Sequence, residues 1–286
     1  MYKIAILGCE NSHANAFLDF IIKDKVYTDI EVLGVYSNDI ESANKLKETY
    51  GVNVAERYDE FVGKVDGIII TARHGDNHYK YAKPYIETGI SMFVDKPITV
   101  SEKDAEDFKA ELIKNNVKVT GGSSLKRADA LAELKKAVQE KEYGIVYGGI
   151  LRSPVSMEND YGDFYFYSQH LVQMTTEIFG HFPASVKAFK NGNVITCTVR
   201  YNEYDVIMEF IDGNYKYFAA ISCEEDFLTK EITLENCYAR EFAEFYTILT
   251  GGEQPQDYDE FFAPVYIMNA IDRSIASGKE EFVKRN

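Results

Sequence analysis

The chain has 286 residues, of which 45% are hydrophobic and 27% charged, the composition of a soluble globular protein long enough for two domains. Its formal net charge of −15 and its pI near 4.8 argue against nucleic acid or an anionic membrane as a partner, because both attract basic surfaces. The four cysteines form no CxxC pair and no metal-binding spacing with the histidines, so we expect reduced thiols, no metal site and a cytoplasmic location. No apolar run is long enough to cross a bilayer, and we expect no signal peptide before the first strand.

The first half of the chain alternates between short apolar runs and helical patterns. The expected strands occupy residues 3–7, 30–36, 65–71, 91–94 and 117–121, and the expected helices occupy residues 14–22, 40–50, 79–88 and a segment that begins at 101. Gly51 fits the C-terminal stop of the second helix, and Ser101 fits the start of a capping box. Alternating strands and helices with short connections predict an α/β fold with a doubly wound parallel sheet.

The loop after the first strand departs from the dinucleotide fingerprint GxGxxG. It reads Gly8-Cys9-Glu10-Asn11-Ser12-His13 and keeps only the first glycine. Glu10 places a side chain and a negative charge where a pyrophosphate normally lies. Either Glu10 points away and the amides of Asn11, Ser12 and His13 hold phosphate at the helix N-terminus, or cofactor binding is weakened. His13 could contact a phosphate or make a structural hydrogen bond.

The end of the second strand bears on the choice between NAD and NADP. In NAD-type domains an acidic residue at this point holds the ribose 2′-hydroxyl. Here the position is Ser37, followed by Asn38 and Asp39. A neutral serine tolerates a 2′-phosphate better than a carboxylate would, although no adjacent arginine offers a charge partner. These residues favour NADP slightly over NAD as the cofactor.

The most specific signal lies where the fourth strand ends. Residues 91–94 are followed by Asp95, Lys96 and Pro97. Ligands of open α/β sheets bind at the carboxyl ends of the strands, and a partly desolvated lysine there works as a proton donor or acceptor. Pro97 restricts the backbone before it, so Lys96 is expected on a stiff turn. From these residues alone, an ordinary strand end with solvated charges is the alternative.

Several segments around this turn follow one longer pattern. They are residues 65–73, Asn77-His78, Gly89 and residues 93–97. In this order they resemble the Gfo/Idh/MocA oxidoreductase family, which reads roughly V-D-x-V-x-I-x-T-P, a histidine, an alanine-rich helix that ends in glycine, and E-K-P. The chain departs from that pattern at Asp95, where the family has glutamate, and at Arg73, where it has proline. Weaker matches extend the resemblance over nearly the whole chain.

The resemblance implies a Rossmann domain, residues 1–121, that binds NAD(P), and an α+β domain, residues 122–286, with a large and mostly antiparallel sheet. The second domain would bind a small-molecule substrate and pair subunits into a homodimer or homotetramer through its sheet, while the last helices pack back toward the Rossmann domain. The residues expected at the cofactor are Gly8, Glu10, Asn11, Ser12, His13, Ser37, Asn38, Thr71, Ala72, Arg73, His78, Asp95 and Lys96.

Two catalytic residues follow from the same resemblance. In the family, the lysine of the E-K-P turn handles a proton or polarises a carbonyl near the nicotinamide, and a histidine in a D-x-x-x-H-x-x-D segment supports it. Lys96 and His170 occupy these positions. Phe166 replaces the first aspartate and cannot relay a proton, so Asp160 or Asp163 would have to substitute from the loop. The alternative for His170 is a packed helix histidine with a structural hydrogen bond.

Residues 158–170 form the most aromatic segment of the chain. Tyr161, Tyr165 and Tyr167 are expected to line a sugar-like substrate pocket. Arg127 and Arg152 are expected to meet an anionic or polyol substrate, although surface salt bridges would explain both arginines equally well.

The remaining sequence predicts a sheet flanked by helices. The expected strands occupy residues 147–151, 194–200, 205–211, 215–222 and 231–234, and the expected helices occupy residues 128–139, 239–249 and 262–277. Turn sequences at 191–193 and 212–214 predict hairpins. Alternating apolar residues allow one face to pack on helices and the other to meet a partner subunit.

Three functional hypotheses result. The first is an NAD(P)-dependent oxidoreductase that moves a hydride to or from a hydroxyl or carbonyl carbon of a sugar, inositol or related polyol. The second is a catalytically inactive Rossmann-fold protein that binds a ligand or regulates, motivated by Glu10 and Phe166. The third is cofactor-dependent chemistry without net oxidation, such as glycoside cleavage by transient oxidation.

Overall fold

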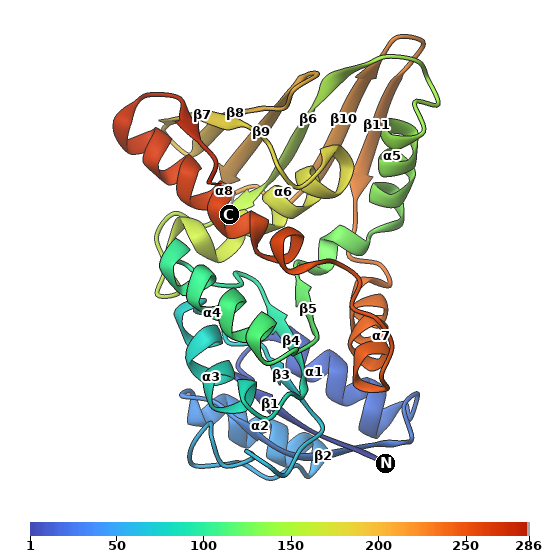
Figure 1. The fold of residues 1–286 in the computed structure, drawn as a ribbon, viewed down its shortest axis with the longest axis vertical. Coiled ribbons are helices and arrows are strands. Elements are labelled where there is room, and N and C mark those ends of the chain that lie inside the picture. Colours follow the sequence, from blue (N-terminus) through green and yellow to red (C-terminus); the bar gives the residue numbers. More distant parts are fainter. Residues whose placement is uncertain (285–286) are drawn as a thin grey trace. The chain divides into compact units, whose positions relative to one another are not determined.

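A computed structural model describes residues 1–284 of the chain, which forms two compact units (Figure 1). The first unit contains residues 1–122 and 238–258. The second contains residues 123–237 and the chain from 259 onward. The segment 238–258, within the predicted second domain, thus packs in the first unit.

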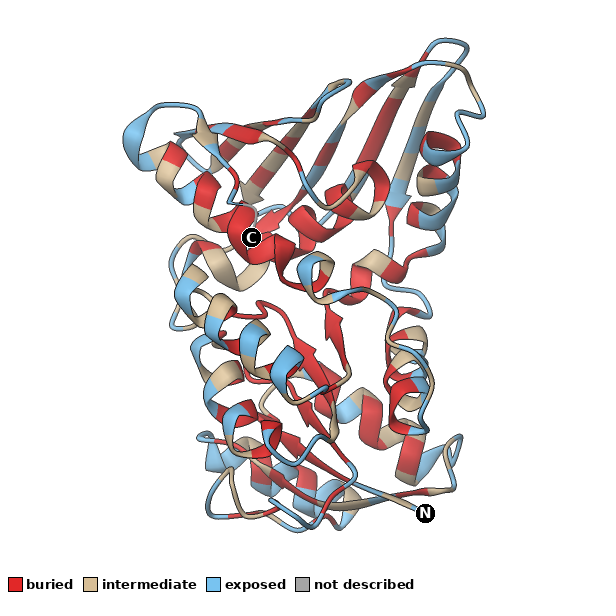
Figure 2. Cartoon of the chain, viewed as in Figure 1, coloured by how far each residue is buried: buried red, intermediate tan, exposed pale blue. Residues whose placement is uncertain are grey.

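The first unit is built on a five-stranded parallel sheet with the order β2-β1-β3-β4-β5. Its strands are β1 (Tyr2–Leu7), β2 (Ile30–Tyr36), β3 (Gly67–Ile70), β4 (Ser91–Asp95) and β5 (Val119–Gly122). Every residue of β3 and β5 is buried, and Figure 2 shows the sheet as the most buried layer of this unit. The predicted doubly wound parallel sheet is confirmed.

Helices surround this sheet. They are α1 (Ser12–Leu18), which continues as the π-helix η1 (Asp19–Lys23), α2 (Ile40–Tyr50), α3 (Asp76–Ile86), α4 (Glu102–Lys114) and α7 (Cys237–Leu249). Gly51 ends α2 in the left-handed region at φ 73°, where glycine carries no steric cost. The Ser101 side chain accepts the Asp104 N–H at 3.1 Å and so caps α4 as predicted.

Aromatic packing places α7 in the first unit. The ring of Phe242 lies 5.1 Å from that of Phe17, and Phe17 lies 5.2 Å from Phe93 of β4. All three side chains are fully buried. Phe245 extends the cluster against Phe93 at 6.4 Å. Burial of four large aromatic side chains explains why this distant segment folds with the first unit.

The second unit is built on a seven-stranded sheet with the order β11-β10-β6-β9-β8-β7-β12. Its strands are β6 (Val146–Val155), β7 (Ser185–Asn191), β8 (Val194–Arg200), β9 (Asp205–Asp212), β10 (Tyr217–Cys223), β11 (Phe227–Ile232) and β12 (Glu281–Phe282). All neighbours pair antiparallel except β6 and β9, so the predicted mostly antiparallel sheet is confirmed.

The strand boundaries differ from the predicted ones at the sheet edges. β11 begins at residue 227, four residues before the predicted start, and β7 and β12 were not expected. β11 and β12 are the edge strands, and β7 lies next to β12. Exposed residues interrupt the apolar pattern of β7 and β11, so pairing with a neighbour decides their conformation.

Three helices accompany this sheet, together with the short 3-10 helix η2 (Ser124–Arg127). They are α5 (Asp129–Gln139), α6 (Phe164–Phe179) and α8 (Tyr258–Ser277). α6 packs on β9, with the Phe164 ring 5.4 Å from that of Phe210. The Ser274 hydroxyl of α8 accepts the Ala188 N–H of β7 at 2.8 Å. Helices therefore cover one face of the sheet.

No helix within residues 1–284 is long and apolar enough to cross a membrane. The four cysteines, all within this range, are buried and form no disulfide. The cytoplasmic location stays a prediction.

Candidate active site

The register of the parallel sheet brings four strand ends into one row. The last paired residues of β2, β1, β3 and β4 align as Tyr36, Leu7, Ile70 and Val94. The residues that follow them are Ser37, Gly8, Thr71 and Asp95. These residues share the carboxyl edge of the sheet, where such folds bind their ligands.

His13 lies between two buried carboxylates at this edge. Its Nδ1 is 3.2 Å from Oδ2 of Asp95, and its Nε2 is 3.1 Å from Oε2 of Glu241 in α7. The histidine is 4% exposed and both acids are 0% exposed. Burial alone would lower the pKa of His13, but the two carboxylates outweigh it and the pKa is raised. His13 is therefore held as an imidazolium, with both ring nitrogens on protein acids and not on a phosphate.

Asn11 ties the loop after β1 to two strand ends. Its Nδ2 donates to the Thr71 carbonyl at 2.6 Å and to Asp95 Oδ2 at 2.8 Å. Its Oδ1 accepts the His13 N–H at 2.9 Å, which caps α1. Because that amide is already bonded, it is not offered to a phosphate. The Lys96 N–H donates to the other oxygen of Asp95 at 2.7 Å.

Lys96 is buried beside Asp95 on the turn after β4. Its side chain is 8% exposed, and its peptide bond to Pro97 is cis. Burial lowers the pKa of the Lys96 amine, the Asp95 charge opposes this, and Arg73 adds to the lowering. A buried lysine with a lowered pKa gives up its proton more readily than a solvated one, which suits a proton acceptor.

His78 supports the same turn from inside. It is fully buried, with Nδ1 2.7 Å from the Pro97 carbonyl and Nε2 2.8 Å from the Ala72 carbonyl. Burial lowers the pKa of His78, so the neutral ring donates to one of these two carbonyls. His78, predicted at the cofactor, thus holds the backbone around Lys96.

Glu10 is directed toward the ends of β2 and β3. The Ser37 hydroxyl donates to its Oε2 at 2.7 Å, and the Arg73 N–H donates to its Oε1 at 3.1 Å. The carboxylate is therefore bound by these two donors. Of the two alternatives for Glu10, this geometry corresponds to a side chain turned away from the loop amides.

Gly8 stands at a position where any side chain would clash with the neighbouring backbone. Its φ is +73°, and a Cβ built there would lie 2.5 Å from backbone atoms of Ala72. The Thr71 hydroxyl donates to its carbonyl at 3.0 Å. Two neighbouring polar residues bond locally, Ser12 with Tyr238 at 3.0 Å and Asn38 with Tyr36 at 2.6 Å.

A second group of polar residues surrounds His170 in the second unit. The His170 Nδ1 lies 2.6 Å from the Ser123 hydroxyl, directly after β5. The Gln173 side chain accepts the Ser123 N–H, and Ser123 accepts the Arg127 Nη1–H at 3.2 Å through its carbonyl. Asp163 instead accepts the Asn159 N–H at 3.0 Å within its own loop. Ser123, which the sequence analysis missed, thus partners the histidine.

The predicted substrate residues separate into two sets. The Tyr167 ring lies 5.5 Å from that of His170, and the Tyr161 ring packs on that of Phe166 at 5.0 Å, tilted by 39°. The Tyr165 hydroxyl instead lies 3.4 Å from Asp272 of α8. Arg152 pairs with Glu209 on the neighbouring strand, which is the salt-bridge alternative for this residue.

A sequence pattern could have predicted Ser123 as a site residue, whereas no sequence pattern could have predicted Glu241. Ser123 directly follows a predicted strand, and strand ends are where ligand-binding residues gather. Glu241 lies in a generic amphipathic helix, and its role depends on a contact across more than 200 residues.

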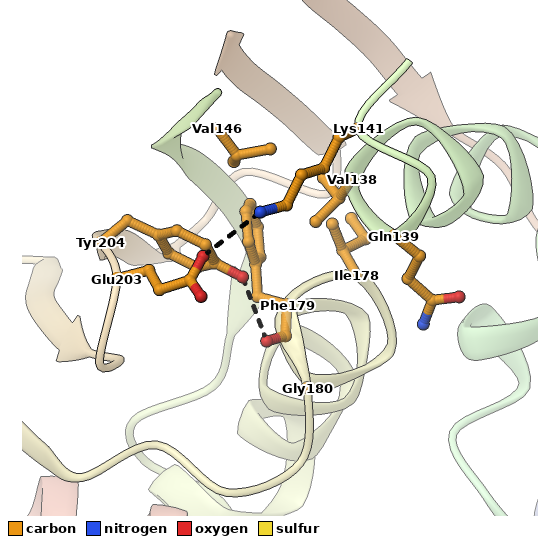
Figure 3. A pocket seen from close by; sticks show the side chains of 9 residues that line it. All are labelled: Val138, Gln139, Lys141, Val146, Ile178, Phe179, Gly180, Glu203 and Tyr204. Carbon is orange, nitrogen blue, oxygen red and sulfur yellow. Dashed lines mark hydrogen bonds and ion pairs between the residues drawn. The ribbon is translucent and has the colours of Figure 1, made fainter. Parts of the chain in front are cut away.

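A cavity of about 180 Å³ lies in the second unit near the ends of α5 and α6 (Figure 3). Its lining residues are Val138, Gln139, Lys141, Val146, Ile178, Phe179, Gly180, Glu203 and Tyr204. None of the predicted site residues lines it. Within residues 1–284, no group of three His, Cys, Asp or Glu side chains is arranged to hold a metal ion.

The parallel sheet, the glycine turn and the buried strand-end lysine define the Rossmann domain of an NAD-binding oxidoreductase. Residues 2–123 match the Gfo/Idh/MocA model, described as an oxidoreductase family with an NAD-binding Rossmann fold. Residues 2–123 therefore match the NAD-binding domain of the Gfo/Idh/MocA oxidoreductases, and the predicted resemblance to this family is confirmed.

Similar proteins agree with this assignment. Uncharacterized oxidoreductase YhhX of Escherichia coli (strain K12) is 22% identical over 136 residues, which are 43% of this chain and 39% of that protein. A myo-inositol dehydrogenase from Corynebacterium glutamicum has 16% identity and a TM-score of 0.83 over 100% of both chains. Myo-inositol 2-dehydrogenase from Lactobacillus plantarum has 11% identity and a TM-score of 0.85 over 99% of both chains. WlbA dehydrogenase from Chromobacterium violaceum, solved with NADH and UDP-GlcNAcA, has 15% identity and a TM-score of 0.83 over 100% of this chain and 96% of that one. At these identities the structures establish a shared fold.

Replacing the buried imidazolium should destabilise the first unit in a pH-dependent way. His13→Gln leaves two buried carboxylates without their cation, which costs about 3–5 kcal/mol. The pKa of His13 is raised above its ordinary value of 6.5, so its stabilisation is complete below that pH and is lost as pH rises through the folded-state pKa. Urea unfolding midpoints of wild type and variant should differ most at pH 6 and least at pH 9. His74→Gln, on a more exposed histidine, is the control; equal midpoints of His13→Gln and wild type at pH 6 would refute the ion cluster.

Proposed function

We propose that this chain is an NAD(P)-dependent dehydrogenase that moves a hydride to or from a hydroxyl or carbonyl carbon of a sugar, inositol or related polyol. The observation that carries the proposal is the buried Lys96 amine at the end of β4, inside the domain of an NAD-binding oxidoreductase family. Neighbours described as inositol dehydrogenases, and one solved with NADH and UDP-GlcNAcA, support the substrate class and the cofactor.

The loop after β1 fits a dinucleotide. Gly8 leaves the backbone open where a side chain would meet Ala72, and Asn11 fixes the loop against Thr71 and Asp95. Glu10 was expected to place a negative charge at the phosphate position, but its carboxylate is bound by the Ser37 hydroxyl and the Arg73 amide. When bound, the nicotinamide supplies the acceptor or donor of the hydride.

Lys96 handles the proton that accompanies hydride transfer. In the oxidation direction, its neutral Nζ accepts the proton of the substrate hydroxyl as the carbonyl forms. In the reduction direction, the ammonium returns that proton to the forming alkoxide. The lowered pKa of Lys96 makes both forms accessible, and Asp95 and His78 hold the backbone of the turn.

His170 supports this proton transfer in a fixed orientation. Its Nδ1 is bonded to the Ser123 hydroxyl, which fixes the orientation of the ring. Tyr167 lies beside the same histidine, Tyr161 packs on Phe166, and Arg127 donates to the Ser123 carbonyl. These three residues are the proposed substrate contacts. Phe166 packs between the two tyrosines and takes no part in the proton path.

Removing the Lys96 amine should abolish turnover without abolishing cofactor binding. For Lys96→Ala we expect kcat to fall by about 10²–10⁴-fold in a polyol screen with NAD and NADP, because the proton acceptor is lost. Lys103→Ala, at an exposed position of α4, should be unchanged. Nicotinamide fluorescence titrations of all three proteins should show binding of NADH or NADPH. Full activity of Lys96→Ala would end the catalytic assignment, and no cofactor binding by wild type would favour an inactive ligand-binding protein.

Removing the Ser123 hydroxyl should disorient His170. Ser123→Ala is expected to lower kcat by roughly 10-fold or more with little change in KM. The His170 ring would lose the hydrogen bond that orients it but would keep its capacity to exchange a proton. The pH dependence of kcat should shift as well, since Ser123 stabilises one state of the ring. Ser123→Thr restores a hydroxyl and should recover most of the activity. An unchanged kcat and pH profile in Ser123→Ala would leave Ser123 with a structural role only.

We further propose that the chain forms a homodimer or homotetramer through the open face of its seven-stranded sheet. The register aligns Phe218, Arg152, Glu209, Thr196 and Phe189 across this face. Phe218 and Phe189 are exposed there, although both are large and apolar. Exposed aromatic side chains on a flat sheet face are typical of subunit contacts.

A charge on this sheet face should dissociate the assembly. Phe218→Glu is expected to shift the mass measured by light scattering from a dimer or tetramer to a monomer, because a buried unpaired carboxylate disfavours association. Ile113→Glu, at an exposed apolar position of α4, should leave the mass unchanged. A monomeric wild type would contradict the proposal.

A further inference from the structure

A carboxylate from another segment, that of Glu10, lies at the end of β2. Ser37 is the first residue after that strand and is 6% exposed. Its hydroxyl lies 2.7 Å from Glu10 Oε2, and Glu10 belongs to the loop after β1. A side chain 27 positions earlier therefore places a carboxylate at the strand end.

The hydrogen bonds of Ser37 fix the direction of this contact. Its hydroxyl oxygen accepts the Asp39 N–H at 3.0 Å, so its single hydrogen is directed to Glu10. The second carboxylate oxygen of Glu10 accepts the Arg73 N–H at 3.1 Å. Two neutral donors thus hold the carboxylate in place and leave its charge uncompensated by a salt bridge.

The carboxylate keeps the capacity to bind a further donor. A carboxylate accepts about four hydrogen bonds, and the contacts of Glu10 with Ser37 and Arg73 use two of them. A ribose hydroxyl is a neutral donor that can occupy a remaining lone pair. A phosphate in the same place would bring a like charge against Glu10, which raises the free energy of the complex.

Neighbouring charges strengthen this discrimination. Asp39, two residues after Ser37, caps α2 and adds a second carboxylate, which accepts the Ser42 hydroxyl at 2.6 Å. Lys45 lies on α2 and acts on Asp39, so its charge is shared with that acid. Arg73, whose N–H binds Glu10, carries the other cation beside this loop, and its charge acts on Lys96.

We infer that Glu10 supplies, from the loop after β1, the carboxylate that NAD-type domains carry at the end of β2, and that it makes the chain select NAD over NADP. The inference rests on the proposed nicotinamide-dependent function and deepens it. The sequence favoured NADP because Ser37 is neutral. Since the serine hydroxyl is bonded to the Glu10 carboxylate, that reason no longer holds. Weakened phosphate binding was one alternative for Glu10 in the sequence, and in this inference Glu10 determines which cofactor the chain selects.

The test compares the binding of NADH and NADPH to the full chain by nicotinamide fluorescence. Wild type is expected to bind NADH at least about tenfold more tightly than NADPH. Glu10→Gln keeps an acceptor for Ser37 but removes the charge, and should reduce the NADH preference roughly tenfold. Glu48→Gln makes the same charge change at an exposed position near the end of α2 and should keep the wild-type ratio.

A rescue variant keeps the test decisive if Glu10→Gln binds both cofactors weakly. Glu10→Gln combined with Ser37→Asp moves the carboxylate onto the strand end and should restore the preference for NADH. Equal or tighter binding of NADPH by wild type, or an unchanged ratio in Glu10→Gln, would overturn the inference and leave the proposed function standing. Failure of wild type to bind either cofactor would remove the proposed function and the inference together.

Discussion

The buried Asp95 carboxylate is the interaction on which the candidate site depends. A fully buried acid must be paired, and here Asn11, His13 and the Lys96 backbone amide satisfy it. These donors come from the loop after β1 and from the turn that carries the lysine, so one carboxylate fixes both. Glu241 completes the ion cluster from α7 and, with the aromatic core around Phe242, holds the 238–258 segment in the first unit. Loss of the Asp95 carboxylate would therefore disturb the loop after β1, the Lys96 turn and α7 together.

The ion cluster also shapes the chemistry of Lys96. A lysine next to a carboxylate would ordinarily stay charged, because Asp95 favours the ammonium. Burial and the Arg73 guanidinium outweigh the charges of Asp95 and Glu241, so the pKa of Lys96 is lowered. The turn therefore combines a rigid backbone with an amine that can change protonation state. That combination is what proton transfer alongside hydride transfer requires.

Two departures from the family pattern are compensated in space. Ser37 lacks the acid expected after β2, and Glu10 reaches the same point from the neighbouring loop. Phe166 lacks the acid expected before His170, and Ser123 meets the histidine from the end of β5. In each case the replacement lies at a strand end, because the carboxyl edge of a parallel sheet gathers residues that are distant in sequence.

The sequence alone determined the architecture, because alternating apolar runs, Gly51 and Ser101 encode local structure that the tertiary fold did not override. It also predicted Lys96 and His170 as catalytic residues, because both occupy positions of the family pattern that the chain resembles. The partners of these residues were decided only by the tertiary structure. His13 was open between a phosphate and an interior role, and Glu241, which settles the choice, is 228 positions away. Ser123, Gln173 and the direction of Glu10 depend in the same way on strand register and helix packing, which no local pattern records. The strands β7 and β12 were missed for the same reason, since pairing and not propensity forms them.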